Sequence, residues 1–123
     1  MIHPADERFP RSARLRKRAE YLAVQGGGRK VRTRAFLALA LDRDDDRVRL
    51  GITTTRRLGG AVIRNRVRRL VREAFRRGIL AVPRGTDLVV IPSSSSSVLP
   101  AAEIMRDLDL LGRRLKRGRE RRS

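Results

Sequence analysis

The chain has 123 residues and a formal net charge of +18, from 31 lysines and arginines against 13 acidic residues. This length allows one domain with a modest core and is too short for two. There is no cysteine and one histidine, His3, which excludes disulfides, thiolate metal sites, a histidine-based triad and a histidine metal cluster.

The positive charge is far beyond what solubility needs. It indicates a polyanionic partner, nucleic acid first and an anionic membrane second. An interfacial membrane helix would set bulky Trp, Phe or Leu against its basic face, whereas the basic segment 61–78 carries mostly Val, Ile and Ala there. No segment has the apolar length of a membrane span, and the start lacks the apolar core of a signal peptide. We therefore expect a cytoplasmic protein that binds nucleic acid and no membrane.

The first part of the chain predicts an arm and a short helix. Residues 1–13 are polar and hold two prolines, so we expect a flexible N-terminal arm. A helix is predicted from Lys17 to Gln25, and glycines 26–28 are suited to end it. These glycines lack the Gly-Lys-Ser/Thr pattern of a nucleotide-binding loop, so we interpret them as a helix stop.

Two apolar segments around an acidic turn predict a β-hairpin. Residues 31–41 are apolar enough for a central strand, and residues 48–55 alternate apolar and polar side chains as a half-buried strand does. Residues 42–46 between them hold four acidic side chains. A carboxylate metal site is conceivable there, but a solvated hairpin loop is the favoured interpretation.

The segment 61–78 is the one around which the chain is organised, and it predicts a helix with two different faces. At 3.6 residues per turn one stripe is apolar and suited to a core, formed by Ile63, Val67, Leu70, Val71 and Ala74. The opposite face is cationic, with Asn65 among Arg68, Arg69, Arg72 and Arg76. Arg64 and Arg66 flank the stripe, and Gly78 is suited to cap the C-terminus.

The cationic face of this helix is not balanced by acids. Arginines four residues apart repel one another, and Glu73 is the only acid in the segment. Arg56 and Arg57 add further charge just before it. The pattern favours a surface that a polyanion neutralises over a merely solvated one.

The rest of the chain predicts a buried strand at 87–91, a flexible serine loop at 93–97 and a helix at 100–114. The helix has an apolar stripe of Ile104, Leu108, Leu111 and Leu115. Residues 116–123 are predicted to be a basic tail, disordered when free. Residues 14–115 thus form one α+β domain in which helices cover a small sheet.

The run from Leu50 to Arg77 resembles the signature of the bacterial ribonuclease P protein component. It contains a Gly-aliphatic strand, the pair Arg56-Arg57, Gly59-Gly60-Ala61-Val62, and then Arg64-Asn65-Arg66 and Arg72-Glu73 on one helix. The resemblance extends over Arg14 to Ile91 and the final helix. It implies an α-β-β-β-α-β-α order, with three helices packed on a small, mostly antiparallel four-stranded sheet, similar to the second domain of ribosomal protein S5. The two strands that flank the central helix would run parallel.

The resemblance also implies a function. In this family the RNA subunit removes the 5′ leader of precursor tRNA by an endonucleolytic hydrolysis that leaves a 5′-phosphomonoester and requires Mg²⁺. The protein binds that RNA and the leader, contributes no catalytic side chain and holds no tightly bound cofactor. We expect ribonuclease P RNA and precursor tRNA as partners, and no protein partner.

The family's functional positions carry over residue by residue. The RNA-binding set is Arg56, Arg57, Arg64, Asn65, Arg66, Arg68, Arg69 and Arg72. The leader cleft, which uses aromatic side chains, corresponds to Tyr21, Gln25, Phe36 and Leu39. Gln25 and Leu39 stand where aromatics are often found, so Tyr21 is the expected stacking platform.

Two alternatives share the charge alone. One is a non-enzymatic ribosomal or other structural RNA-binding protein. The other is a DNA-binding module with its basic helix in the major groove, which the lack of a helix-turn-helix spacing disfavours.

Overall fold

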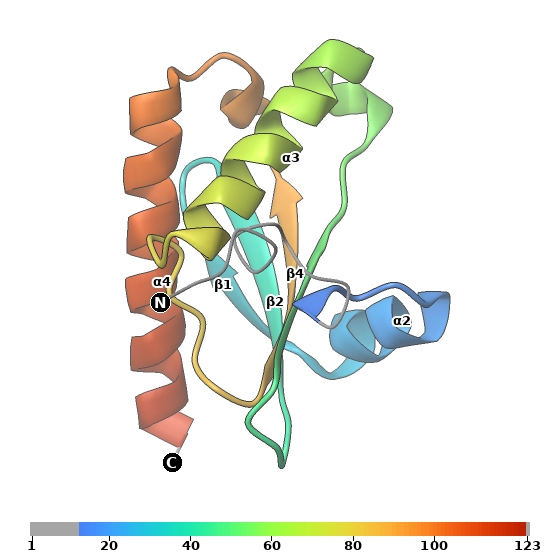
Figure 1. Cartoon of the computed structure of the whole chain (residues 1–123), viewed down its shortest axis with the longest axis vertical. Coiled ribbons are helices and arrows are strands. Elements are labelled where there is room, and N and C mark those ends of the chain that lie inside the picture. Colours follow the sequence, from blue (N-terminus) through green and yellow to red (C-terminus); the bar gives the residue numbers. More distant parts are fainter. Residues whose placement is uncertain (1–12, 123) are drawn as a thin grey trace.

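The computed structural model describes residues 13–122, with only the backbone described at positions 121 and 122. The arm predicted over residues 1–13 therefore lies outside the described residues except for Ala13. In chain order the elements are α2 (Arg18–Gly27), β1 (Arg29–Arg32), β2 (Phe36–Asp42), β3 (Val48–Ile52), α3 (Ala61–Arg76), β4 (Thr86–Pro92) and α4 (Ala101–Arg122). Short 3-10 helices precede α3 (η2, Arg56–Leu58) and α4 (η3, Ser94–Ser97). This order, shown in Figure 1, confirms the predicted α-β-β-β-α-β-α fold.

The four strands form one sheet in the order β1-β2-β4-β3. The pairs β1–β2 and β2–β4 are antiparallel, and β3 pairs with β4 in parallel, as expected for the strands that flank the central helix. The predicted hairpin of residues 31–41 with 48–55 is wrong, because β4 lies between β2 and β3. The side chains of β4 from Thr86 to Val90 are all buried, so this strand gains most from a central position with a neighbour on each side.

The single strand predicted over residues 31–41 is also wrong, because the chain turns at residues 33–35 and forms β1 and β2 as a hairpin. The N–H of Thr33 donates to the carbonyl of Phe36 at 2.9 Å and closes the turn. Asp107 of α4 accepts hydrogen bonds from the Thr33 hydroxyl and from the N–H of Ala35. The turn is stabilised by a helix more than seventy positions away in the chain, and no Gly or Pro marks it in the sequence.

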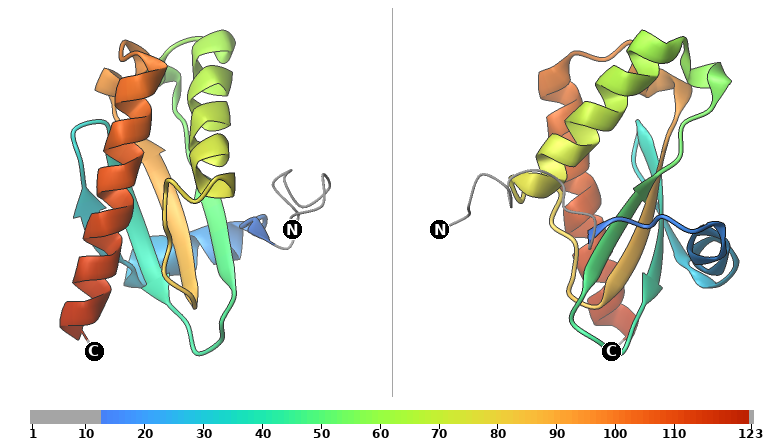
Figure 2. Two further views of the ribbon diagram at one scale, coloured as in Figure 1. Left: turned by 60° about the vertical axis from the view of Figure 1, so that its left-hand side comes forward. Right: turned by 45° about the vertical axis from the view of Figure 1, so that its right-hand side comes forward.

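Helices cover both faces of the sheet, with α3 and α4 on one face and α2 on the other, as Figure 2 shows. Successive residues of β2 alternate between two cores. Phe36, Ala38 and Ala40 join the core under α3 and α4, whereas Leu37, Leu39 and Leu41 face α2. The predicted stripe of α4 is confirmed, since Ile104, Leu108, Leu111 and Leu115 are fully buried.

The central helix α3 packs much as its pattern predicts. Val67, Val71 and Ala74 are fully buried, and Leu70 is partly buried against the same core. Ile63 is an exception at 37% exposure, because the first turn of α3 projects beyond the end of the sheet (Figure 1). The predicted C-terminal cap is confirmed, since Gly78 follows the helix with a φ of 77°.

Two segments predicted to be flexible are ordered. Residues 93–97 form η3 and its N-cap, where the hydroxyls of Ser93 and Ser95 donate to the carbonyl of Arg34 at 3.1 and 3.0 Å. The predicted tail from residue 116 continues α4 through Arg122. Arg119 reaches across to the carbonyl of Gly85 and to the hydroxyl of Thr86, at 3.4 and 2.9 Å, which docks this part of the helix. No helix within residues 13–122 combines the length and apolar character that crossing a bilayer requires.

Candidate nucleic-acid interface

The outward face of α3 exposes polar and cationic side chains. Asn65, Arg69 and Arg72 are exposed, and Arg64 and Arg68 are half-buried beside them. In the part of the chain that the structure describes, none of these arginines has an acidic group within ion-pair distance. Two further exposed arginines, 56 and 57, lie in η2 just before the helix begins. The geometry therefore gathers most of the predicted RNA-binding set on one surface.

Two arginines of α3 are engaged within the protein. Arg66 is half-buried, and its Nη2 donates to the carbonyl of Leu99 at 3.0 Å, which ties α3 to the segment before α4. Arg76 forms an ion pair with Glu73. The sequence pattern treats all the arginines of the helix alike, and only packing separates these two from the exposed ones.

A small pocket beside Tyr21 lies at the edge strand β3. Its volume is about 100 Å³, and its lining comprises Arg14, Leu15, Tyr21, Leu50, Gly51, Ile52 and Arg72. The Tyr21 ring lies directly against Gly51, since a Cβ at that glycine would come within 2.7 Å of the ring atoms Cε1, Cζ and Oη. Burial disfavours the phenolate form and raises the pKa of Tyr21 above its usual value.

This pocket connects the two faces of the sheet. Tyr21 comes from α2 and Arg72 from α3, and the two helices lie on opposite sides. They meet because β3 is the last strand of the sheet, so a long side chain of α3 passes around its edge. The segment at Arg14 pairs with β3 there, and the N–H of Leu15 donates to the carbonyl of Leu50 at 3.1 Å.

The four residues predicted for the leader cleft do not form one site. Phe36 is 1% exposed and lies in the core under α3 and α4, on the opposite face of the sheet from α2, so its assignment to the cleft is wrong. Leu39 does face α2 but is buried beneath it with Val24, and Gln25 is exposed on the helix. The β-strand alternation places Phe36 and Leu39 on different faces. The structure adds Arg14 and Gly51 to the surroundings of Tyr21.

Ion pairs hold α2 against the sheet and so fix the position of Tyr21. The buried carboxylate of Asp87 accepts from Arg49 at 2.9 and 2.7 Å and from Arg43 at 3.0 Å. Arg49 also pairs with Glu20, the neighbour of Tyr21 in α2. Hydrogen bonds from the N–H groups of Lys17 and Arg16, with Arg49 nearby, lower the pKa of Glu20 to about 2.

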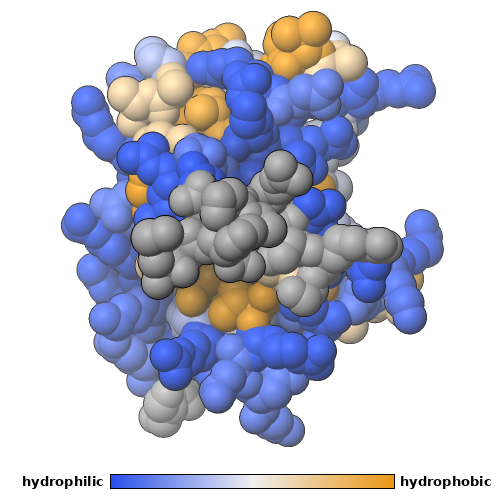
Figure 3. Space-filling view, viewed as in Figure 1, coloured by the Kyte–Doolittle hydropathy of each residue, from blue (hydrophilic) through white to orange (hydrophobic). Residues whose placement is uncertain are grey.

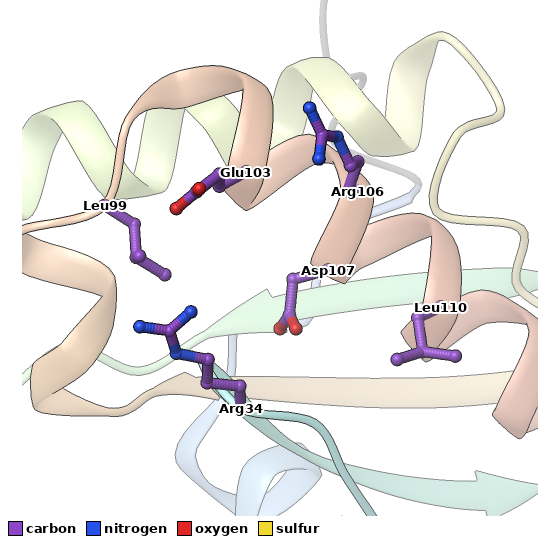
Figure 4. Close-up of a pocket in the computed structure, with 6 residues that line it drawn as sticks. All are labelled: Arg34, Leu99, Glu103, Arg106, Asp107 and Leu110. Atoms are coloured by element: carbon purple, nitrogen blue, oxygen red, sulfur yellow. The ribbon is translucent and has the colours of Figure 1, made fainter.

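A second concavity lies between the β1–β2 turn and the N-terminal half of α4. Its volume is about 250 Å³, and Figure 4 shows its lining of Arg34, Leu99, Glu103, Arg106, Asp107 and Leu110. Acidic and basic groups are mixed there, and Asp107 already holds the turn. This concavity lacks the uniform positive charge of the α3 face. Figure 3 shows that hydrophilic residues also dominate the surface along α4.

These features define a small basic α+β protein with a cationic helix face for a polyanion. Residues 9–116 match the model of the family Ribonuclease P. The chain belongs to the ribonuclease P protein family. It is thus a subunit of ribonuclease P that acts in tRNA processing, and the family implies association with the ribonuclease P RNA.

Relatives and solved structures agree with this assignment. The ribonuclease P protein component of Desulforapulum autotrophicum is 36% identical over 109 residues, which cover 89% of this chain and 93% of the relative. That of Gluconacetobacter diazotrophicus is 44% identical over 100 residues, covering 80% and 86%. The RNase P protein structure from Thermotoga maritima has a TM-score of 0.73 at 35% identity, covering 81% of this chain and 96% of that one. The one from Staphylococcus aureus has a TM-score of 0.75 at 26% identity, covering 82% and 93%.

Proposed function

We propose that this chain binds ribonuclease P RNA through the outward face of α3 and holds the 5′ leader of precursor tRNA beside Tyr21. The RNA subunit then carries out the endonucleolytic cleavage that leaves a 5′-phosphate, and the protein raises its efficiency by binding. The observation that carries the proposal is the exposed set Asn65, Arg69 and Arg72, whose arginines have no acidic partner among residues 13–120.

The α3 face suits a phosphate backbone. Arginine donates to phosphate through a planar fork of N–H groups, and neutralising phosphates releases their condensed counterions. Asn65 lies among the arginines and both donates and accepts hydrogen bonds. Helix–helix repulsion within the free protein is relieved when the RNA brings negative charge to this face.

The surroundings of Tyr21 suit a single-stranded leader. One side of the ring is covered by Gly51, so a base would stack on the remaining side, and single strands are commonly held by such stacking. Arg72 lines the same pocket and also belongs to the α3 face. The leader and the RNA subunit would therefore lie next to each other on the protein.

We assign catalysis and its Mg²⁺ to the RNA subunit. The sequence has one histidine and no cysteine, so it offers few groups for acid–base or nucleophilic chemistry. In the acidic loop, Asp45 is paired with Arg43 and Arg47, and Asp42 with Arg29. These carboxylates are poorly placed to hold a metal ion, whereas RNA phosphates supply oxygen ligands of the kind that Mg²⁺ prefers. In this proposal the complex works in the cytoplasm.

A cleavage assay tests the proposal. The RNA subunit is incubated with precursor tRNA at low Mg²⁺, with and without the protein, and release of the leader is measured. We expect clear stimulation by the protein, and stimulation that falls as the leader is shortened. Protein that binds the RNA subunit yet leaves leader release unchanged at every Mg²⁺ concentration would overturn the proposed role.

A further inference from the structure

A cationic groove lies at the sheet edge opposite the Tyr21 pocket. It runs between β1, the first strand in the sheet order, and the C-terminal half of α4. Its volume is about 320 Å³, and it is lined by Lys30, Val31, Arg114, Arg117 and Gly118. A neighbouring hollow of about 270 Å³ shares Arg117 and adds Arg113, Lys116 and Glu120. We refer to the first of these as the β1–α4 groove.

The walls of the β1–α4 groove are held in place by hydrogen bonds. Arg29 donates through Nη1 to the carbonyl of Leu115 at 3.3 Å, and Arg114 donates to the carbonyl of Arg32. Gly118 permits the close approach of the two elements, since a Cβ there would come within 2.9 Å of Nη1 of Arg29. The groove is therefore a built feature of the fold and not a gap between loosely placed side chains.

The charge in this groove is not balanced internally. Lys30, Arg32 and Arg117 are exposed, and no acid of the described chain lies within ion-pair distance of them. Glu120 is the one acid among the lining residues of the two hollows. Basic residues on an edge strand also discourage strand-to-strand aggregation. That role does not account for the matching cations on α4, because they lie on a helix.

We propose that the β1–α4 groove is a second RNA-binding surface, which binds the phosphate backbone of a segment of ribonuclease P RNA distinct from the one on α3. The inference rests on the proposed function. Lysine and arginine without aromatic neighbours bind phosphates and do not stack bases, so this contact positions the RNA without reading its sequence. Because α4 packs against both α3 and β1, the two surfaces flank it and the protein would bridge two RNA segments.

The first test compares two double variants that remove equal charge. Lys30→Gln/Arg117→Gln changes the groove, and Arg47→Gln/Arg106→Gln changes exposed arginines elsewhere. Affinity for the RNA subunit is measured over a range of salt concentrations. We expect the groove variant to lose affinity roughly tenfold and to lower the salt slope by about 1 to 2, since each phosphate contact contributes about 0.7 to 0.9. The control pair should change affinity less than about twofold. Equal effects of the two variants would overturn the inference.

The second test locates the RNA segment directly. The chain has no cysteine, so a hydroxyl-radical probe attaches only at an introduced one, either Lys30→Cys or Arg69→Cys. We expect the two probes to cleave different stretches of the RNA subunit. Cleavage from Arg69→Cys alone would overturn the groove while leaving the α3 interface standing, even if the groove were found to bind an acidic protein. Cleavage from neither position, with wild-type protein failing to bind the RNA, would instead count against the proposed function.

Discussion

Arginines with the same spacing along α3 have different roles because they touch different groups. Arg69 projects into solvent, whereas Arg66 turns inward and donates to the carbonyl of Leu99 at 3.0 Å. An internal hydrogen bond from a charged group contributes about 1.5 to 3 kcal/mol, while an exposed, unpaired arginine contributes little to folding. RNA binding and stability should therefore be separable one residue at a time.

We expect Arg69→Gln to weaken binding of the RNA subunit and to leave the free energy of unfolding nearly unchanged. Arg66→Gln should lower that free energy by about 1 to 3 kcal/mol, because the Leu99 carbonyl loses its charged donor. Denaturant unfolding and RNA titration of the same two variants give both numbers. Equal unfolding free energies for the two variants would show that the Arg66 hydrogen bond is not structural.

Tyr21 and Gly51 form a pair in which the absence of a side chain is as important as the ring. We expect Tyr21→Ala to weaken binding of precursor tRNA with a leader by about 1 to 3 kcal/mol, the usual contribution of one stacked base. Gly51→Ala should act in the same direction without removing the ring, since its Cβ would come within 2.7 Å of Tyr21 and displace it. Tyr21→Phe is the matched control and should bind nearly as the wild type.

The comparison substrate for these variants is mature tRNA, which has no leader. Its binding should change little in either variant, and so should binding of the RNA subunit. A loss shared by all three RNAs would mean that Tyr21 supports the fold and not the leader.

At the scale of elements, the length of α4 has the largest consequence. The helix has 22 residues, and the part beyond Leu115 docks on the end of β4 through Arg119. A basic sequence with few apolar residues resembles a disordered tail, but arginine can bond backbone carbonyls of a neighbouring loop. The C-terminal turns of α4 are thus part of the domain and form one wall of the β1–α4 groove.

We expect deletion of residues 116–123 to lower the stability of the domain, since the hydrogen bonds of Arg119 to residues 84–86 are lost. Several such bonds at about 1 kcal/mol each predict a loss of about 1 to 3 kcal/mol. Thermal unfolding of the shortened chain provides the measurement, with Lys116→Gln as a control that removes charge but no contact of Arg119. An unchanged melting temperature would support the disordered tail predicted from the sequence.

At the scale of the whole molecule, ion pairs link α2, β3, β4 and the acidic loop into one network around Asp87. Asp87 is 4% exposed and accepts from both Arg43 and Arg49. Removing one partner of a buried pair leaves an uncompensated charge. The network therefore couples the position of Tyr21 to the integrity of the sheet.

This network makes stability depend on acid pH with a definite sign. The pKa of Glu20 falls from 4.5 to about 2 on folding, so its contribution is present above the unfolded value and is lost as the pH drops through that window. We expect Glu20→Gln to be less stable than the wild type at neutral pH and to approach it at a pH of about 2. Denaturant unfolding at several pH values measures the difference, and a gap that does not close on acidification would assign the effect to something other than ionisation.

The sequence by itself determined the class of protein and its principal surface. Charge and the absence of cysteine left a polyanion-binding protein, and helical periodicity located the buried stripes of α3 and α4 together with the exposed arginines. The Arg64-Asn65-Arg66 segment and its surroundings led to the correct family. These inferences succeed because they depend on local periods of 3.6 or 2 residues and on composition, which a chain carries whatever its partners are.

Only the tertiary structure decided which segments lie beside each other. The insertion of β4 between β2 and β3, the turn at residues 33–35 and the docking of Arg119 all depend on contacts between distant positions. The same is true of the site, where Phe36 faces the wrong core and Arg72 reaches Tyr21 around the edge of β3. Strand order and the fate of each arginine are settled by competition for buried area and hydrogen-bond partners across the whole molecule, and no local pattern encodes the outcome.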